Sequence, residues 1–179
     1  MYRRVTYNSR INSDDLIFYN NLYGDRGVDY IAPSQLTILS QKFKPNKSFV
    51  MSLVFMPTSG TIGDNFVIKI CDTNLRGIDF TVLNGSFVIT GYNQTPIECT
   101  PIFIGNKDDT KLMSFNGVFE ANGNNTYKLS NASFRLLKDI NTIIAFGNIN
   151  IESLAVSSSA AYVVVPNKIT FKQLIIKYI

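Results

Sequence analysis

From Leu36 onward, apolar side chains recur at every second residue, and this pattern constrains the fold more than any other feature of the sequence. In the stretch SFVMSLVF, one face of an extended chain carries Phe49, Met51, Leu53 and Phe55. The stretches NFVIKIC and GIDFTV alternate in the same way. Successive side chains of a strand point to opposite faces, so this alternation indicates strands with one face buried.

Turn residues divide the alternating region into many short strands. Asn84-Gly85 stands between two alternating runs, which is a strong signal for a β-hairpin. Further strands are predicted at residues 97–104, 112–119, 126–130, 142–151, 160–165 and 168–179. Short strands at steady spacing, joined by Asn/Gly turns, are typical of an antiparallel β-sandwich or barrel.

Two short segments look helical instead. Leu136, Leu137 and Ile140 have helical spacing behind a capping Ser133, which predicts a helix over residues 133–140. The run Ser13-Asp14-Asp15 is a candidate cap for a helical turn over residues 16–21.

Residues 1–35 have a different character and are predicted to form an extended N-terminal arm, with residues 36–179 as the sandwich domain. The arm holds five of the nine tyrosines and shows no sustained period. Tyrosine combines apolar area with a polar tip, which suits a segment that contacts a neighbouring subunit. The alternative is that the arm packs on its own domain. The candidate partner-binding residues are Tyr2, Arg3, Arg4, Tyr7, Arg10, Tyr19 and Tyr23.

The chain contains no histidine, the side chain most used for proton transfer near neutral pH and the commonest protein metal ligand. The two cysteines, Cys71 and Cys99, form no CxxC motif, and we interpret them as small buried residues that either stay free or pair with each other. No spacing selects a pair of carboxylates for glycoside hydrolysis. We therefore predict no enzyme activity, no catalytic residue, no cofactor and no metal site.

Aspartates in predicted loops are the one set of candidate oxygen ligands for calcium. They are Asp25, Asp29, Asp72, Asp108 and Asp109. None belongs to the repeating Asp/Asn loop pattern with a distal Glu, so we interpret them as solvated turn residues.

The charge of the chain is mild and scattered. The net charge is +4 without a basic run of five residues, so we expect no nucleic-acid binding. No apolar run approaches the length of a membrane span, so we expect no membrane partner. Charged residues make up only 17% of the chain, so asparagine must supply much of the polar surface. A low-charge polar surface suits a protein buried in an assembly, and enrichment in Asn, Ile, Lys, Tyr and Phe is also what AT-rich codons produce.

Two surface features bear on binding. A glycan site needs exposed aromatic rings beside amide groups, and the predicted loops offer Arg76, Tyr92 and Asn93; ordinary turn chemistry is the alternative explanation. Over residues 145–165 the only charge is Glu152. If such a strand lies at a sheet edge it invites pairing with another chain, whereas burial within the sandwich is the alternative.

Three stretches carry a resemblance to a known type of domain: SFVMSLVFMP, NFVIKICDTNLRGIDFTVLNGSFVIT and the closing ITFKQLIIKYI. Over about residues 36–179 their rhythm resembles jelly-roll β-sandwiches of the laminin-G and concanavalin-like type. The resemblance implies an all-β, antiparallel jelly-roll sandwich. Such sandwiches occur in carbohydrate-binding modules and in auxiliary or fibre proteins of viral capsids, and a shared fold does not decide between these uses.

We therefore expect a non-enzymatic auxiliary or decoration protein of a viral or phage particle, located in the virion. Its expected partners are other capsid proteins and further copies of itself. The alternative function is a carbohydrate-binding or receptor-binding module.

Overall fold

The structure is a computed structural model of the chain, and it describes residues 16–19, 36–40, 43–57, 66–83, 86–102, 112–139, 142–166 and 169–179. Within these ranges it forms twelve strands and no helix. The strands are β1 (Leu16–Tyr19), β2 (Leu36–Ser40), β3 (Phe49–Pro57), β4 (Phe66–Cys71), β5 (Gly77–Leu83), β6 (Ser86–Thr90), β7 (Ile97–Ile102), β8 (Leu112–Gly123), β9 (Thr126–Asp139), β10 (Thr142–Ala155), β11 (Tyr162–Pro166) and β12 (Ile169–Tyr178).

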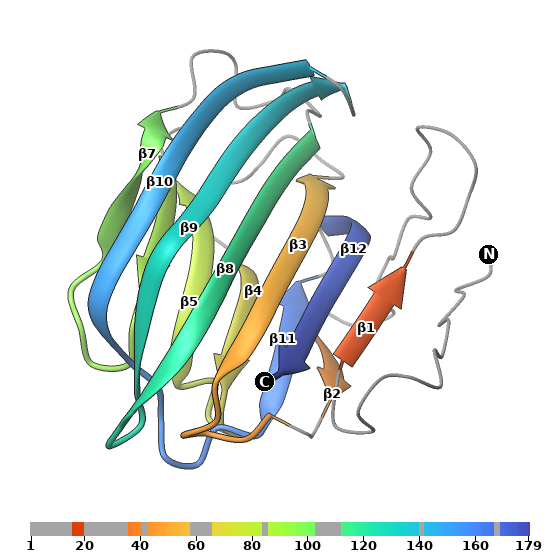
Figure 1. The fold of residues 1–179 in the computed structure, drawn as a ribbon. Coiled ribbons are helices and arrows are strands. Elements are labelled where there is room, and N and C mark those ends of the chain that lie inside the picture. The colour runs from red at the N-terminus through yellow and green to blue at the C-terminus, as the bar shows by residue number, and fades with distance from the viewer. Residues whose placement is uncertain are drawn as a thin grey trace.

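The strands make two six-stranded antiparallel sheets packed face to face (Figure 1). Sheet A has the order β1-β12-β3-β8-β9-β10, and sheet B has the order β2-β11-β4-β5-β6-β7. The chain crosses between the sheets repeatedly, for example from β7 in sheet B to β8 in sheet A and from β10 back to β11. The predicted all-β antiparallel sandwich is confirmed.

The period-two pattern is what buries one face of each sheet. In β3, the side chains of Phe49, Met51, Leu53 and Phe55 are fully buried, and the residues between them are only half-buried. Burial of a large apolar side chain stabilises the fold by about 1.5–3 kcal/mol relative to exposure. The alternation therefore selects which face of β3 meets sheet B.

Aromatic rings join the two sheets at the centre of the core. Phe87 of β6 stacks on Phe134 of β9, with ring centroids 4.4 Å apart. Phe80 of β5 meets Phe119 of β8 edge-on at 6.1 Å. Such pairs contribute about 0.5–1.5 kcal/mol each beyond the area that they bury.

Both predicted helical segments are wrong where the structure describes them. Residues 133–139 continue β9, which pairs with β8 on one side and β10 on the other. Ala132, Phe134 and Leu136 point into the core at every second position, so period-two burial overrides the helical spacing of the leucines. Leu16–Tyr19 is strand β1, because its backbone pairs with β12 at the edge of sheet A.

The predicted hairpins agree with the observed pairing. Leu83 of β5 is the register partner of Ser86 of β6, on either side of Asn84-Gly85, two residues that lie outside the described ranges. Between β8 and β9, Asn124 and Asn125 both have positive φ, of 52° and 56°. Two such residues make the tight turn whose twist matches that of paired strands.

The N-terminal arm and its boundary at residue 35 remain predictions. Four of its residues form β1 and pair with β12 of the same chain, and the rest lies outside the described ranges. In the described part of the chain there is no helix long and apolar enough to cross a membrane.

Candidate functional site

A line of hydroxyl and amide side chains crosses sheet A on the face turned away from sheet B. Ser52 of β3 is the register partner of Asn116 of β8, which in turn faces Ser133 of β9, and Ser133 faces Asn148 of β10. Register partners on one face of a sheet have Cβ atoms about 4.5–5.5 Å apart. We call these four residues the polar row. They form one continuous hydrogen-bonding surface from four strands.

A relay of hydrogen bonds orients one end of the polar row. Gln173 Nε2 of β12 donates to Ser52 Oγ at 2.7 Å, and Ser52 Oγ donates to Asn116 Oδ1 at 2.7 Å. Because Asn116 Oδ1 accepts this bond, the carboxamide presents its NH₂ group as the free donor. Among the described residues, none accepts a hydrogen bond from that group. A ligand on this face would meet a donor of fixed direction.

An open hollow of about 430 Å³ lies beside the polar row and is lined in part by Asn116, Val118, Glu120 and Asn131. A β-bulge shapes it: Asn116 pairs with Ser133 and Val118 with Ser130, so Asn131 and its neighbour oppose a single residue of β8. Asn131 takes a positive φ of 56°. The volume falls within the range of small-ligand sites, about 300–1,000 Å³.

Strand β10 adds an exposed aromatic ring to the same face. Phe146, Asn148 and Asn150 point outward at every second position, and the Phe146 side chain is 52% exposed. Asn150 Oδ1 accepts a hydrogen bond from the Asn131 N–H at 2.9 Å, which fixes the bulge. The register partner of Phe146 is Arg135 of β9. The Phe146 ring therefore lies two positions along β10 from Asn148, the amide that this strand contributes to the polar row.

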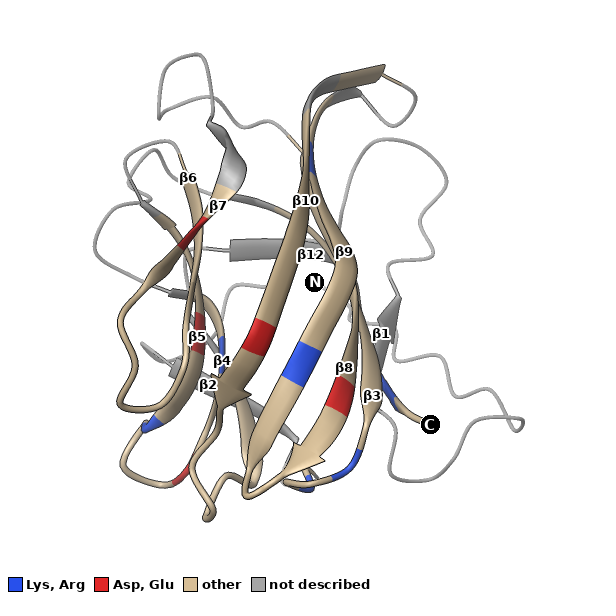
Figure 2. Ribbon diagram, turned by 60° about the vertical axis from the view of Figure 1, so that its left-hand side comes forward, with Lys and Arg blue, Asp and Glu red and all other residues tan. Residues whose placement is uncertain are grey.

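Charged side chains lie on both sides of the polar row on this face: Arg135 of β9 on one side, and a group of three on the other. Glu120, Lys128 and Glu152 occupy neighbouring positions on β8, β9 and β10 (Figure 2). Lys128 Nζ lies 3.8 Å from Glu152 Oε2, and both side chains are exposed. Exposed pairs of this kind stabilise a fold little. The four residues of the polar row themselves carry no charge.

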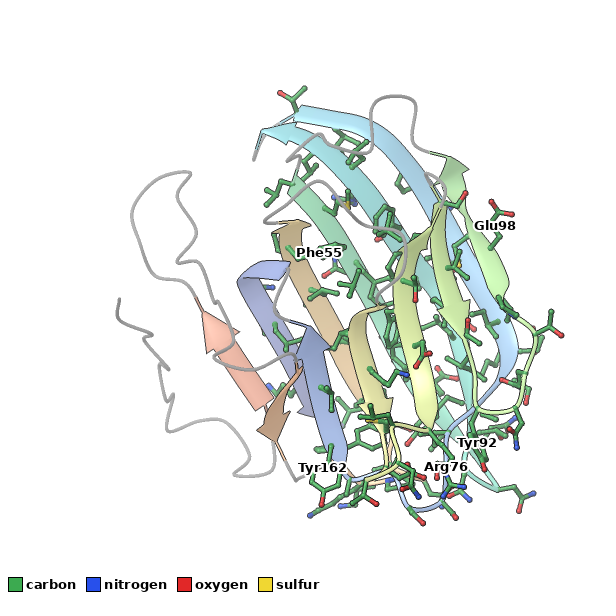
Figure 3. The ribbon with its side chains drawn as sticks, turned by 180° about the vertical axis from the view of Figure 1, so that it is seen from behind. Phe55, Arg76, Tyr92, Glu98 and Tyr162 are labelled. Atoms are coloured by element: carbon green, nitrogen blue, oxygen red, sulfur yellow. The ribbon has the colours of Figure 1, made fainter. Side chains whose placement is uncertain are left out.

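The predicted glycan-loop residues lie elsewhere. Arg76 and Tyr92 sit together at one end of the sandwich (Figure 3). Arg76 Nε is 3.0 Å from Asp72 Oδ2, so its head group holds the turn between β4 and β5. Tyr92 is half-buried, and its N–H donates to Ala155 O at 2.8 Å; Asn93 is exposed with a φ of 54°. Glycan binding at this end stays a prediction.

Asp72 is a buried structural carboxylate. Its oxygens accept hydrogen bonds from the N–H groups of Asn74 and Arg76 and from Ser157 Oγ, besides the Arg76 side chain. Burial alone would raise the pKa of Asp72, but these hydrogen bonds and the charge of Arg76 outweigh it, so the pKa lies below its ordinary value. Because protein donors bind both of its carboxylate oxygens, Asp72 stabilises the turn between β4 and β5. The other four aspartates considered for calcium lie outside the described residues.

Cys71 and Cys99 are buried and free, which answers the question of their pairing. Burial raises the pKa of each thiol to about 11, so neither carries a thiolate near neutral pH. In the described part of the chain, no group of three His, Cys, Asp or Glu side chains converges.

The structure describes no side chain of the predicted partner-binding residues in the arm. Tyr2, Arg3, Arg4, Tyr7, Arg10 and Tyr23 lie outside the described ranges, and only the backbone of Tyr19 is described, within β1. Partner binding by the arm therefore stays a prediction. The sequence reasoning missed the polar row. Its members occupy the polar positions of alternating strands, but only the register shows that they align.

Comparison with known proteins assigns this chain to no family. No protein-family model and no curated protein matches the chain. A solved structure described as a bifunctional GH43-CE protein of Bacteroides eggerthii is similar with a TM-score of 0.39 and 15% identity, over 93% of this chain and 22% of that one. The carbohydrate recognition domain of Emp47p is similar with a TM-score of 0.45 and 13% identity, over 97% of this chain and 99% of that one.

The chain spans 22% of the length of the GH43-CE protein, so it corresponds to only part of it. Both TM-scores are below 0.5, and at this level neither similarity bears on function. The functional argument therefore rests on the polar row and its surroundings.

Proposed function

We propose that this protein is a non-enzymatic β-sandwich module that binds a neutral carbohydrate on the outer face of sheet A. The observation that carries the proposal is the relay from Gln173 through Ser52 to Asn116, which aims a carboxamide donor along a row of further hydroxyl and amide groups. A sugar ring is rimmed with hydroxyl groups that both donate and accept. Side chains of Asn and Ser match both roles.

The neighbouring ring of Phe146 supports the same ligand class. The C–H face of a sugar is weakly apolar, and an aromatic side chain offers a flat apolar surface for it. Phe146 lies on β10 two positions before Asn148, so one ligand can cover the ring and the amide together. The hollow next to Asn116 and Val118 provides room for a second sugar unit.

Binding of a glycan array by the purified full chain, followed by calorimetry with the best ligand, tests the proposal. Asn116→Ala should weaken binding about fivefold, which corresponds to about 1 kcal/mol for one hydrogen bond. The matched control is Asn122→Ala, an exposed asparagine near the end of the same strand, about 20 Å along β8. Equal affinities of the two variants, or no saturable binding of any glycan, would rule out this face as the site.

A structural role in a viral or phage particle is the second candidate. The observation that favours it is β10, a long outer strand of sheet A that carries little charge and exposes Ile143 and Phe146, a surface that suits contact with another subunit. Incorporation of the chain into particles, with the isolated chain binding no glycan, would favour this role over carbohydrate binding.

A further inference from the structure

We infer that the sugar unit in the hollow beside the polar row is a 2-acetamido sugar whose acetyl group contacts Val50 and Val118. This inference rests on the proposed function and names its ligand more narrowly. The hollow is lined by side chains of three chemical kinds: apolar groups, a hydrogen-bond donor and hydrogen-bond acceptors. An acetamido group needs all three, because it combines a methyl group, a carbonyl oxygen and an N–H group.

Two valines form the apolar part of the hollow. Val50 of β3 and Val118 of β8 are register partners on the outer face of sheet A, so their Cβ atoms are about 4.5–5.5 Å apart. Val118 is 38% exposed and Val50 is half-buried, so one ligand methyl group can contact both. This contact removes apolar area from water. A hydroxyl group at the same place would instead lose hydrogen bonds to water against the valines.

The donor of the hollow is the carboxamide of Asn116, two positions before Val118 on the same face of β8. Asn116 Oδ1 accepts from Ser52 Oγ at 2.7 Å, so the NH₂ group is the part left for a ligand. This group has two hydrogens. One can serve a hydroxyl group at the polar row, and the other can serve the carbonyl oxygen of the acetyl group.

Glu120 supplies an acceptor at the opposite end of the hollow, two positions after Val118. Its register partner Lys128 lies 3.8 Å from Glu152 Oε2, and no described residue forms an ion pair with Glu120 itself. The exposed Glu120 carboxylate is therefore available to a ligand N–H.

The order of these groups along β8 matches the geometry of an acetamido group. Asn116, Val118 and Glu120 follow one another at every second position, as donor, apolar group and acceptor. The C=O and N–H of a trans amide point in opposite directions. The carbonyl oxygen can therefore face Asn116 while the N–H faces Glu120, which leaves the methyl group for the valines.

Calorimetry of the purified full chain with matched pairs of short oligosaccharides tests the inference. The members of a pair differ only at C2, which carries an acetamido group in one and a hydroxyl group in the other. Pairs of gluco and of galacto configuration are both used. In at least one pair, the acetamido member should bind about fivefold more tightly or better, because it adds a methyl contact and a hydrogen bond.

Val118→Thr tests whether the valines produce this preference. Threonine keeps the branched shape of valine but replaces one methyl group with a hydroxyl group, so the preference for the acetamido member should fall about threefold. The matched control is Val54→Thr, at a half-buried residue on the same face of β3, about 13 Å from Val50 along the strand. This variant should keep the wild-type preference. Melting temperatures show that both variants remain folded.

The inference is overturned if the two members of every pair bind equally, if the hydroxyl member binds more tightly in every pair, or if Val118→Thr and Val54→Thr change the preference equally. The proposed function survives each of these results when a glycan binds saturably and Asn116→Ala weakens that binding. A chain that binds no glycan at all refutes the proposed function, and this inference with it.

Discussion

The Gln94 side chain binds the backbone of both Ser153 and Ala155, as a neighbouring strand would. Gln94 Oε1 accepts from the Ala155 N–H at 2.8 Å, and Nε2 donates to Ser153 O at 3.1 Å. Gly91 leaves room for this contact, because a Cβ at Gly91 would lie 1.8 Å from Gln94 Oε1. A side chain from the loop between β6 and β7 thereby holds that loop against β10.

Removal of this contact should destabilise the sandwich. Gln94→Ala deletes two hydrogen bonds to backbone groups, and we expect the free energy of unfolding to fall by about 1–2 kcal/mol in urea titrations. Thr95→Ala, at an exposed residue next to it, is the control. Gly91→Ala should cost a similar amount by displacing Gln94, and the double variant should cost less than the sum. Full additivity would show that the two residues act separately.

Asp72 should make stability depend on pH in acid. Its pKa in the fold is below the ordinary value of 3.8, so the folded state keeps the carboxylate ionised to lower pH than the unfolded chain does. The resulting stability is present above the ordinary pKa and is lost as the pH falls through the folded pKa. Asp72→Asn should therefore be less stable than wild type near neutral pH, and the difference should shrink in acid.

Asp79 provides the opposite case on the same sheet. Burial raises the pKa of Asp79, although the charge of Lys69, whose Nζ is 3.1 Å from Oδ1, opposes this. Its contribution therefore favours folding at low pH and is lost as the pH rises through the folded pKa. In urea titrations, Asp79→Asn should still lose stability as the pH falls into the acid range, because Asp72 is unchanged in that variant.

The two aspartates together give the contradicting outcome for Asp72. An Asp72→Asn variant whose stability varies with pH as that of the wild type does would contradict the role given to Asp72.

Phe134 tests the aromatic contact between the sheets. Its ring stacks on Phe87 across the core and is fully buried. Phe134→Ala should lower the free energy of unfolding by about 3–5 kcal/mol, measured by chemical denaturation. The neighbouring Arg135→Ala, at an exposed position of the same strand, should change it by less than about 0.5 kcal/mol. A comparable loss in both variants would mean that the segment does not alternate as a strand.

The sequence predicts the sandwich because alternation is a local signal. Phe49 and Phe55 are recognisable as core residues from the spacing of their neighbours alone, and they are fully buried. Residues 133–140 are predicted to be a helix because Leu136, Leu137 and Ile140 also fit helical spacing, but residues 133–139 belong to β9. The decisive feature there is pairing with β8 and β10, the strands just before and after β9, whose residues lie outside the short window in which helical spacing is recognised.

The polar row was beyond sequence reasoning for the same physical reason. Ser52 and Asn116 are 64 positions apart, and only the register of β3 against β8 makes them hydrogen-bond. For the predicted glycan-binding residue Arg76, by contrast, the local sequence alone is informative. Arg76 follows Asp72 by four residues in a turn, and that local spacing already favours an ion pair over a free ligand-binding group.

The most direct test of carbohydrate binding is an NMR titration of the isotope-labelled full chain with a neutral oligosaccharide selected on the array. The account predicts that chemical shifts change along the polar row, at Ser52, Asn116, Ser133 and Asn148, and at Phe146. It also predicts that the amide signals of Asn116 respond most strongly, since its donor faces outward. Shift changes confined to the loop end with Arg76 and Tyr92, or no saturable change at all, would contradict it.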